Sequence, residues 1–276
     1  MDIVKTYYEK ESSDYDKEFY RGDSKYPTLK YRHNYILKRV NELNFPDHAK
    51  VLDIGCGPGE MVLDLMKNNW EIWGIDIAEN MIAIAKKKIE QIKDKSNIIH
   101  LEVGDIEKLA FEDNFFDLII CAGVIEYLAD DEKWSKEITR VLRPGGILLI
   151  NITNKYAIRR WTASIIEKLK NSRLLFNLMN FTKQKILRKG KLHHFPFKPR
   201  LHSPKGFDHF LASLGFKKLS HNYFDFTLLP APFDTLLRFI TIPIRKSMEK
   251  YTEKNMKFTG AGYIVCVKLK EKNYKY

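Results

Sequence analysis

The most informative stretch of this 276-residue sequence is Val51-Leu52-Asp53-Ile54-Gly55-Cys56-Gly57-Pro58-Gly59-Glu60. Its apolar half predicts a buried strand over 50–54, and a helix is expected over about 59–68. Three glycines at alternate positions lack Cβ atoms, so the backbone can turn tightly and approach a ligand at the start of the helix. A turn without a ligand is the weaker interpretation, because three glycines make a turn entropically costly. We therefore predict a ligand-binding loop at 55–59.

The spacing of the glycines separates two classes of cofactor. A dinucleotide fingerprint, G-x-G-x-x-G, would need its third glycine at position 60, where the sequence has Glu60. The carboxylate of Glu60 would repel a pyrophosphate, whereas a ligand with an ammonium group and a sulfonium tolerates nearby carboxylates such as Asp53. The pattern G-x-G-x-G therefore favours S-adenosylmethionine over NAD.

Strand and helix patterns alternate on both sides of this loop. Short β-rich runs predict strands over 70–76, 97–103, 116–121, 146–152, 216–226 and 262–268. Apolar residues at helical spacing predict helices between the strands, one with Ile82, Ala85, Ile89 and Ile92 on a single face, another with Trp134, Ile138 and Val141. Helices are also expected over 1–20, 28–43 and 204–214. This alternation predicts an α/β fold with a parallel sheet and right-handed crossovers.

Further motifs follow the loop in a specific order. They are Asp76 at the end of the second strand, Gly104-Asp105-Ile106 after the third, Phe116-Asp117-Leu118-Ile119-Ile120-Cys121, and Arg143-Pro144-Gly145-Gly146. With them, residues 49–152 resemble the class I S-adenosylmethionine-dependent methyltransferases of the small-molecule type. The resemblance implies a doubly wound, seven-stranded, mostly parallel sheet with an antiparallel last strand, helices on both faces and helical lid insertions. It also implies S-adenosyl-L-methionine as cofactor and S-adenosyl-L-homocysteine as product.

The resemblance further implies which residues bind the methionine end of the cofactor. Gly55, Cys56 and Gly57 would line the methionine part and the ribose, and Asp53, two residues ahead of Gly55, belongs to the same site. The carbonyl group of Cys121 would accept a hydrogen bond from the ammonium group of the cofactor. No residue is assigned to a metal.

The adenosine end has its own expected residues. Asp76 would accept hydrogen bonds from both ribose hydroxyls, which requires an ionised acceptor at the carboxyl end of a strand. Asp105 would accept a hydrogen bond from the adenine amino group. The backbone of Ile106 and the side chains of Ile77 and Met81 would bracket the ring.

No catalytic residue is assigned. The implied reaction is an SN2 transfer of the sulfonium methyl, for which alignment and desolvation can supply most of the rate. Many family members carry a histidine within 123–128, where this chain reads GVIEYL, so the roles of Glu126 and Tyr127 stay open. His202 is the best histidine candidate for a general base, although most such histidines only pack or face solvent.

The first two predicted helices carry three more candidates. In similar enzymes an N-terminal helix folds over the cofactor, which would place Tyr7 and Tyr15 there, with core packing as the alternative. Arg32 would clamp the carboxylate of the cofactor, with a solvated surface position as the alternative.

The net charge of +12 comes from one segment. Residues 155–205 hold 14 Lys and Arg but a single acidic residue, Glu167, and the rest of the chain is close to neutral. Aromatic residues interleave with this charge, and residues 227–259 repeat the theme, so helices here would cap an apolar substrate or lie on an anionic bilayer. We expect a small, hydrophobic or anionic acceptor methylated on O or N, with peripheral contact to an anionic membrane left open.

Two other functions are alternatives to small-molecule methylation. The basic segment would also suit RNA, but the sequence has no separate RNA-binding module and no N/D-P-P-Y-type motif, so nucleic acid is not the expected partner. A non-catalytic cofactor-binding scaffold is the other alternative, against which the intact loop with Asp76 and Asp105 argues.

The chain is expected to divide into four parts. They are a helical cap (1–46), the cofactor-binding core (47–154), a basic helical insertion (155–203), and the C-terminal part of the core (204–276) with a second insertion at about 227–259. No run of about 20 apolar residues is present, and the N-terminus lacks an apolar signal-peptide segment. The isolated cysteines Cys56, Cys121 and Cys266 suit a reducing compartment. A cytoplasmic protein, with peripheral membrane association left open, is the expectation.

Overall fold

A computed structural model describes residues 2–19, 27–92, 98–161, 198–227, 229, 237–254 and 256–271. Seven strands form one sheet: β1 (Lys50–Ile54), β2 (Glu71–Asp76), β3 (Ile98–Val103), β4 (Phe116–Cys121), β5 (Leu142–Thr153), β6 (Phe216–Phe224) and β7 (Gly262–Leu269). Their order is β3-β2-β1-β4-β5-β7-β6. Neighbours pair in parallel from β3 to β5, and β7 runs antiparallel to both β5 and β6. The predicted mostly parallel sheet with an antiparallel last strand is confirmed.

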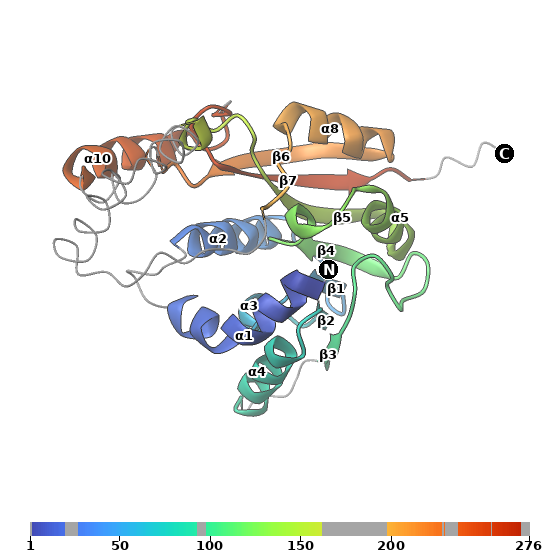
Figure 1. Ribbon diagram of the computed structural model, residues 1–276. Helices are drawn as coiled ribbons and strands as arrows, with labels where there is room; N and C mark the ends of the chain where they lie inside the picture. Colours follow the sequence, from blue (N-terminus) through green and yellow to red (C-terminus); the bar gives the residue numbers. More distant parts are fainter. Residues whose placement is uncertain are drawn as a thin grey trace.

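Helices cover both faces of this sheet (Figure 1). They are α1 (Asp2–Phe19), α2 (Pro27–Glu42), α3 (Glu60–Leu65), α4 (Glu79–Glu90), α5 (Glu132–Val141), α8 (Pro204–Ser213) and α10 (Arg238–Met248), with 3-10 helices η1 (Ile125–Tyr127) and η3 (Glu249–Tyr251). Side chains of α5 and α8 pack on one face, and side chains of α2, α3 and α4 pack on the other. The doubly wound prediction is therefore confirmed.

The central strands are apolar because both of their faces are covered. In β4, Ile119 and Cys121 belong to the core on the α5 side, while Leu118 and Ile120 belong to the core on the α2 side. All six β4 residues are buried. This explains why the strands read as continuous apolar runs in the sequence and not as alternating ones.

Most element boundaries lie within two residues of those predicted, and two differ more. The helix expected over 59–68 spans only Glu60–Leu65. Strand β5 begins at Leu142 and not at Gly146, since the pairing with β4 shifts register between Phe116 and Leu118 and the extra residues continue the strand as an irregularity.

Most of the basic insertion, residues 162–197 including His193 and His194, lies outside the described residues. Phe233 and Leu236 of the second expected insertion lie outside them too. The two ends of the insertion lie side by side. Asn154 and His202 form a parallel β-bridge, and the Lys155 N–H donates to the carbonyl oxygen of His202 at 3.0 Å. The second expected insertion contains α10 and η3.

The strand order reverses between β1 and β4. The chain moves from β1 outward to β2 and β3, then returns to the other side of β1 for β4 and β5. In open α/β sheets, ligands bind outside the carboxyl ends of the strands at such a point. The glycine loop after β1 lies there.

Candidate functional site

The loop after β1 turns back toward β2. The backbone N–H groups of Gly55 and Cys56 both donate to the carbonyl oxygen of Ile75, at 2.8 and 3.0 Å. Gly57 has a φ of 54°, and a Cβ added there would meet nothing within 4 Å, so its space opens into the pocket. Gly55 has a φ of 71°, and its Cβ would lie 2.3 Å from Val124 Cγ2. Glycine is required at position 55 by close packing and favoured at 57 by backbone conformation.

Asp76 joins this loop to the start of α4. One carboxylate oxygen accepts a hydrogen bond from the Gly57 N–H and the other from the Ala78 N–H, each at 2.9 Å. Burial raises the pKa of Asp76, although these N–H donors pull it down. Each oxygen keeps a second lone pair, so the fixed carboxylate can still accept hydrogen bonds from hydroxyl groups of a ligand.

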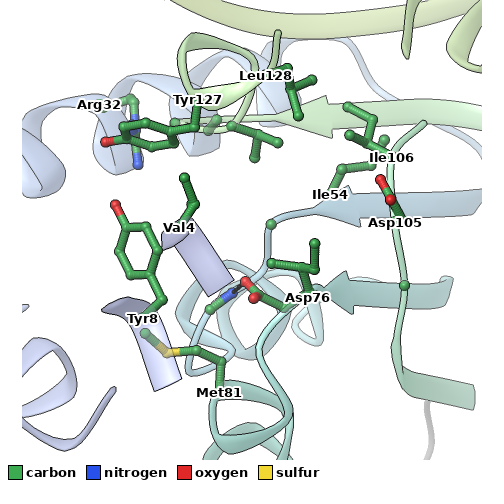
Figure 2. A pocket seen from close by; sticks show the side chains of 17 residues that line it. Val4, Tyr8, Arg32, Ile54, Asp76, Met81, Asp105, Ile106, Tyr127 and Leu128 are labelled. Carbon is green, nitrogen blue, oxygen red and sulfur yellow. Dashed lines mark hydrogen bonds between the residues drawn. The ribbon is translucent and has the colours of Figure 1, made fainter. Parts of the chain in front are cut away.

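A pocket of about 740 Å³, part of it open to solvent, lies above Asp76 (Figure 2). Seventeen residues line it: Val4, Tyr8, Arg32, Ile54, Gly55, Gly57, Asp76, Ile77, Met81, Gly104, Asp105, Ile106, Ala122, Gly123, Val124, Tyr127 and Leu128. Figure 2 shows Asp105 and Ile106 at one end, and Arg32, Tyr8 and Tyr127 at the other.

Helix α1 closes one side of the pocket. Val4 and Tyr8 lie one helical turn apart and therefore face the pocket together. The Tyr8 ring contacts the Tyr127 ring edge-on, with centroids 6.0 Å apart. Glu9 holds the helix in place, because its carboxylate accepts hydrogen bonds from the backbone N–H groups of Glu79 (2.6 Å) and Asn80 (2.9 Å) at the start of α4.

A second pocket, of about 480 Å³, adjoins the first behind the glycine loop. The two share Arg32, Gly55, Gly57 and Ala122. Asp53 lines the second pocket at 4% exposure, and its Oδ2 has no hydrogen-bond partner among the described residues. Burial raises the pKa of Asp53 to about 7, with a further rise from Asp76 and a decrease from Arg32.

Arg32 is the cation that the two pockets share. Its guanidinium lies against Gly123, where an added Cβ would come within 2.4 Å of Nη1. Within the described ranges Arg32 forms no hydrogen bond or ion pair, so its donors remain available to an anionic group.

The structure brings most of the expected cofactor-binding residues together. Gly55, Gly57, Asp76, Ile77, Met81, Asp105 and Ile106 line the first pocket, and Asp53 and Cys56 line the second. Cys121 is buried and lines neither, whereas Ala122, the next residue, lines both. The roles expected for these residues stay predictions.

The secondary candidates divide differently. Arg32 and Tyr127 line the pocket, but Tyr7 does not, and its neighbour Tyr8 occupies the place expected for it. The side chain of Tyr15 lies outside the described residues. Glu126 is buried beside the pocket without lining it, and burial raises its pKa. Val4 and Tyr8 are four residues apart, which places them on one face of a helix, and this spacing would have identified the face of α1 that lines the pocket.

The side chain of His202 contacts Asp131 outside the two pockets. Its Nε2 lies 3.1 Å from Asp131 Oδ2, and Arg200 donates to the other oxygen of the same carboxylate at 2.5 Å. Hydrogen bonds from His202 and Arg200 hold the pKa of Asp131 well below its ordinary value despite burial. His202 lines neither of the two pockets, so the geometry gives it no path to a substrate there.

Part of the chain is similar to known methyltransferases. Residues 52–150 match the family model described as a methyltransferase domain. The demethylmenaquinone methyltransferase of Staphylococcus saprophyticus is 36% identical over 122 residues, covering 43% of this chain and 51% of that protein. The ubiquinone biosynthesis O-methyltransferase of Coxiella burnetii is 32% identical over 105 residues, or 38% and 44% of the two chains. This chain thus spans about half the length of the curated relatives that it matches.

A solved structure has the same fold. The SAM-dependent methyltransferase of Methanosarcina mazei superposes with a TM-score of 0.55 at 16% identity, covering 84% of this chain and 97% of that one. At this identity the likeness concerns the fold alone. It agrees with the seven-stranded mixed sheet.

Proposed function

We propose that this chain, in which residues 52–150 match a methyltransferase domain, is a class I S-adenosylmethionine-dependent methyltransferase that transfers the sulfonium methyl to a small acceptor molecule. The observation that carries the proposal is the pair of adjoining pockets at the reversal point of the sheet. Their groups match the two ends of the cofactor.

The adenosine end fits the first pocket. Asp76 is fixed by two backbone N–H groups at the end of β2 and offers acceptors to the ribose hydroxyls. Asp105 and Ile106 lie at the far end of the pocket, with Met81 on the α4 side (Figure 2). These residues provide one carboxylate for the adenine amino group and apolar surfaces for the ring faces.

The methionine end fits the second pocket. An α-amino acid carries one carboxylate and one ammonium group, and this pocket offers Arg32 for the first and the unpartnered carboxyl group of Asp53 for the second. Binding an ammonium group would stabilise the ionised form of Asp53, whose pKa of about 7 leaves it partly protonated in the free protein at neutral pH. The cofactor would therefore bridge both pockets across Gly55 and Gly57.

The chemistry of the step needs little from the protein. The bound cofactor would supply an electrophilic methyl group: an acceptor O or N atom would bond to the methyl carbon as the carbon–sulfur bond breaks, the acceptor's proton would pass to solvent, and S-adenosyl-L-homocysteine would leave as a neutral thioether. Walls such as Val4, Val124 and Leu128 would exclude water and hold the acceptor in line. We assign no general base.

The acceptor that we propose is a small hydrophobic or anionic metabolite. Relatives named for demethylmenaquinone and ubiquinone biosynthesis support a hydrophobic ring compound, although they match over only part of their length. Tyr8 and Tyr127, whose rings meet edge-on at one end of the pocket, would offer such a ring an aromatic wall (Figure 2).

Methyl transfer from cofactor with a labelled methyl group tests this proposal. The full chain is incubated with a short-chain naphthohydroquinone, a simple phenol, an aliphatic amine and bulk RNA in separate reactions. We expect label in a small acceptor, with the hydroquinone the best of the panel. Label in RNA alone would contradict the proposal and support the RNA alternative.

A further inference from the structure

Helix α10 turns apolar side chains toward solvent. Phe239 is 71% exposed, Ile240 49%, Ile242 41% and Ile244 39%. The polar Thr241 of the same helix is buried at 4% exposure. A surface helix ordinarily buries its apolar stripe and exposes its polar one, so α10 reverses the normal arrangement. We call Phe239, Ile240, Ile242 and Ile244 the α10 surface.

Positive charge accompanies this surface. Residues 238–258 contain six Lys and Arg against two acidic residues, Glu249 and Glu253. Lys246, Lys250 and Lys254 are exposed. Glu249 is partly withdrawn from solvent and hydrogen-bonds to Tyr31 of α2, so it does not offset the exposed lysines fully.

Exposed rings continue along the chain from α10. Tyr251 is 48% exposed and Phe258 is 58% exposed. The ammonium groups of Lys254 and Lys257 lie 4.7 and 4.9 Å from the centroids of these two rings, respectively. Aromatic rings paired with lysines are suited to the boundary between lipid headgroups and acyl chains.

The start of the basic insertion, around Ile158, contacts the same segment. The Ile158 N–H donates to the carbonyl oxygen of Phe258 at 2.7 Å. Ile158 is 46% exposed, and Trp161, three residues later, is 66% exposed. Two segments far apart in sequence therefore meet with apolar side chains exposed on both.

We propose that the α10 surface docks on an anionic membrane, with Phe239 and the three isoleucines entering the headgroup region and the neighbouring lysines meeting lipid phosphates. Exposed apolar groups supply burial, and the excess of basic residues supplies attraction to anionic lipid. A second copy of this chain fits less well, because a symmetric contact would bring two positively charged surfaces together. No α10 residue lines either pocket, so the proposal is independent of the methyl-transfer proposal.

Vesicle co-sedimentation of the full chain tests this inference. The vesicles contain equal parts of phosphatidylglycerol and phosphatidylcholine, with phosphatidylcholine alone for comparison. We expect binding to the mixed vesicles that weakens with added salt and is much weaker on phosphatidylcholine. The double variant Phe239→Ser/Ile242→Ser should bind at least about tenfold more weakly, since it removes two apolar groups from the buried area.

Ile98→Ser is the matched control. Ile98 is 57% exposed but lies on β3, at the opposite edge of the sheet from β6. The Ile98→Ser variant should bind vesicles as strongly as the unmodified chain does. Failure of the unmodified chain to sediment, or unchanged binding by the double variant, would overturn the inference. So would a dimer in sedimentation velocity that the double variant dissociates, because the surface would then be an interface between copies.

A cofactor titration separates this outcome from the methyl-transfer proposal. The double variant should retain the affinity of the unmodified chain for S-adenosylhomocysteine, which also shows that it is folded. A chain that binds vesicles but not the cofactor would sustain the membrane inference and remove the proposed function.

Discussion

At the scale of single residues, Asp53 is the most unusual group in the site. A buried carboxyl group with an unpartnered oxygen destabilises the folded chain when it ionises. Its pKa of about 7 lies above the ordinary value of 3.8, so this destabilisation is complete above pH 7 and disappears as the pH falls through the ordinary value. Such a group is usually retained because a ligand needs it.

The first prediction concerns the pH dependence of Asp53. As the pH rises from about 4 to about 7, the melting temperature of the cofactor-free chain should fall relative to that of Asp53→Asn, and the difference should level off at higher pH. Affinity for S-adenosylhomocysteine should change in the opposite sense, strengthening with rising pH in the unmodified chain and little in the variant. Differential scanning calorimetry and titration calorimetry measure the two effects. Parallel pH profiles for both proteins would contradict the assignment.

The second prediction concerns Arg32 and uses two glycines with similar backbones. Gly123 (φ 84°) and Gly215 (φ 92°) both need a left-handed conformation, so Ala at either position costs about 1–2 kcal/mol of strain. Only at Gly123 would the added Cβ displace Arg32, since at Gly215 the nearest atom is 3.9 Å away. Gly123→Ala should lose at least about tenfold in cofactor affinity, whereas Gly215→Ala keeps it. Equal affinities in calorimetry would show that Arg32 does not contact the cofactor.

Residue spacing in the sequence located one end of the first pocket better than the other. The glycines and the acids after β1, β2 and β3 could be placed because the carboxyl ends of parallel strands converge at one edge. Tyr8 and Tyr127 could not be paired from sequence, because they come from elements that meet only through long-range packing. The same holds for the proximity of Arg32 and Gly123.

At the scale of elements, α1 depends on a contact with α4. The α4 N-cap residue, Ala78, has no side-chain acceptor, and Glu9 of α1 supplies one from outside the helix. Lys5 adds an ion pair with Glu79 at 3.3 Å. The same contact therefore caps one helix and holds another over the pocket.

The third prediction follows from this cap. Glu9→Ala should lower the stability of the α1 contact by about 1 kcal/mol, speed amide exchange in α1, and weaken cofactor binding several-fold. Hydrogen exchange by mass spectrometry and calorimetry measure these changes. The exposed Glu112 provides the control variant, Glu112→Ala, which should leave both unchanged. Unaltered exchange in α1 after loss of Glu9 would show that other contacts hold the helix.

Element boundaries show where sequence patterns mislead. Pro144 and two glycines predict a break before the last parallel strand, yet β5 runs from Leu142 through them. Gly145, with a φ of 79°, lets the strand bend while pairing resumes at Ile147 opposite Leu118. Turn-forming residues can thus lie in an irregular part of a strand. Local sequence alone does not distinguish such an irregularity from a loop.

At the scale of the whole molecule, the basic insertion leaves and rejoins the core at one place. The bridge between Asn154 and His202 joins its two ends at the end of β5. None of the helices in the described part of the chain is both long and apolar enough to cross a membrane.

The fourth prediction concerns this organisation. Replacing residues 162–197 with a short Gly-Ser linker should leave cofactor affinity nearly unchanged, because the described residues that line both pockets come from other parts of the chain. Methyl transfer to the acceptor should be abolished if the insertion covers the acceptor, as the sequence predicts. Calorimetry and the labelled-methyl assay give the two readouts. Full turnover by the shortened chain would exclude a role of the insertion in acceptor binding.

Calorimetric titration of the full chain with S-adenosylhomocysteine, alone and after Asp76→Ala, tests the central claim most directly. We predict a clear binding heat for the unmodified chain and about a hundredfold weaker binding for the variant, which loses two charge-assisted hydrogen bonds to the ribose. Asp47→Ala, at an exposed carboxylate that lines neither pocket, should bind like the unmodified chain. No heat with the unmodified chain, or undiminished binding after Asp76→Ala in a folded variant, would contradict the account.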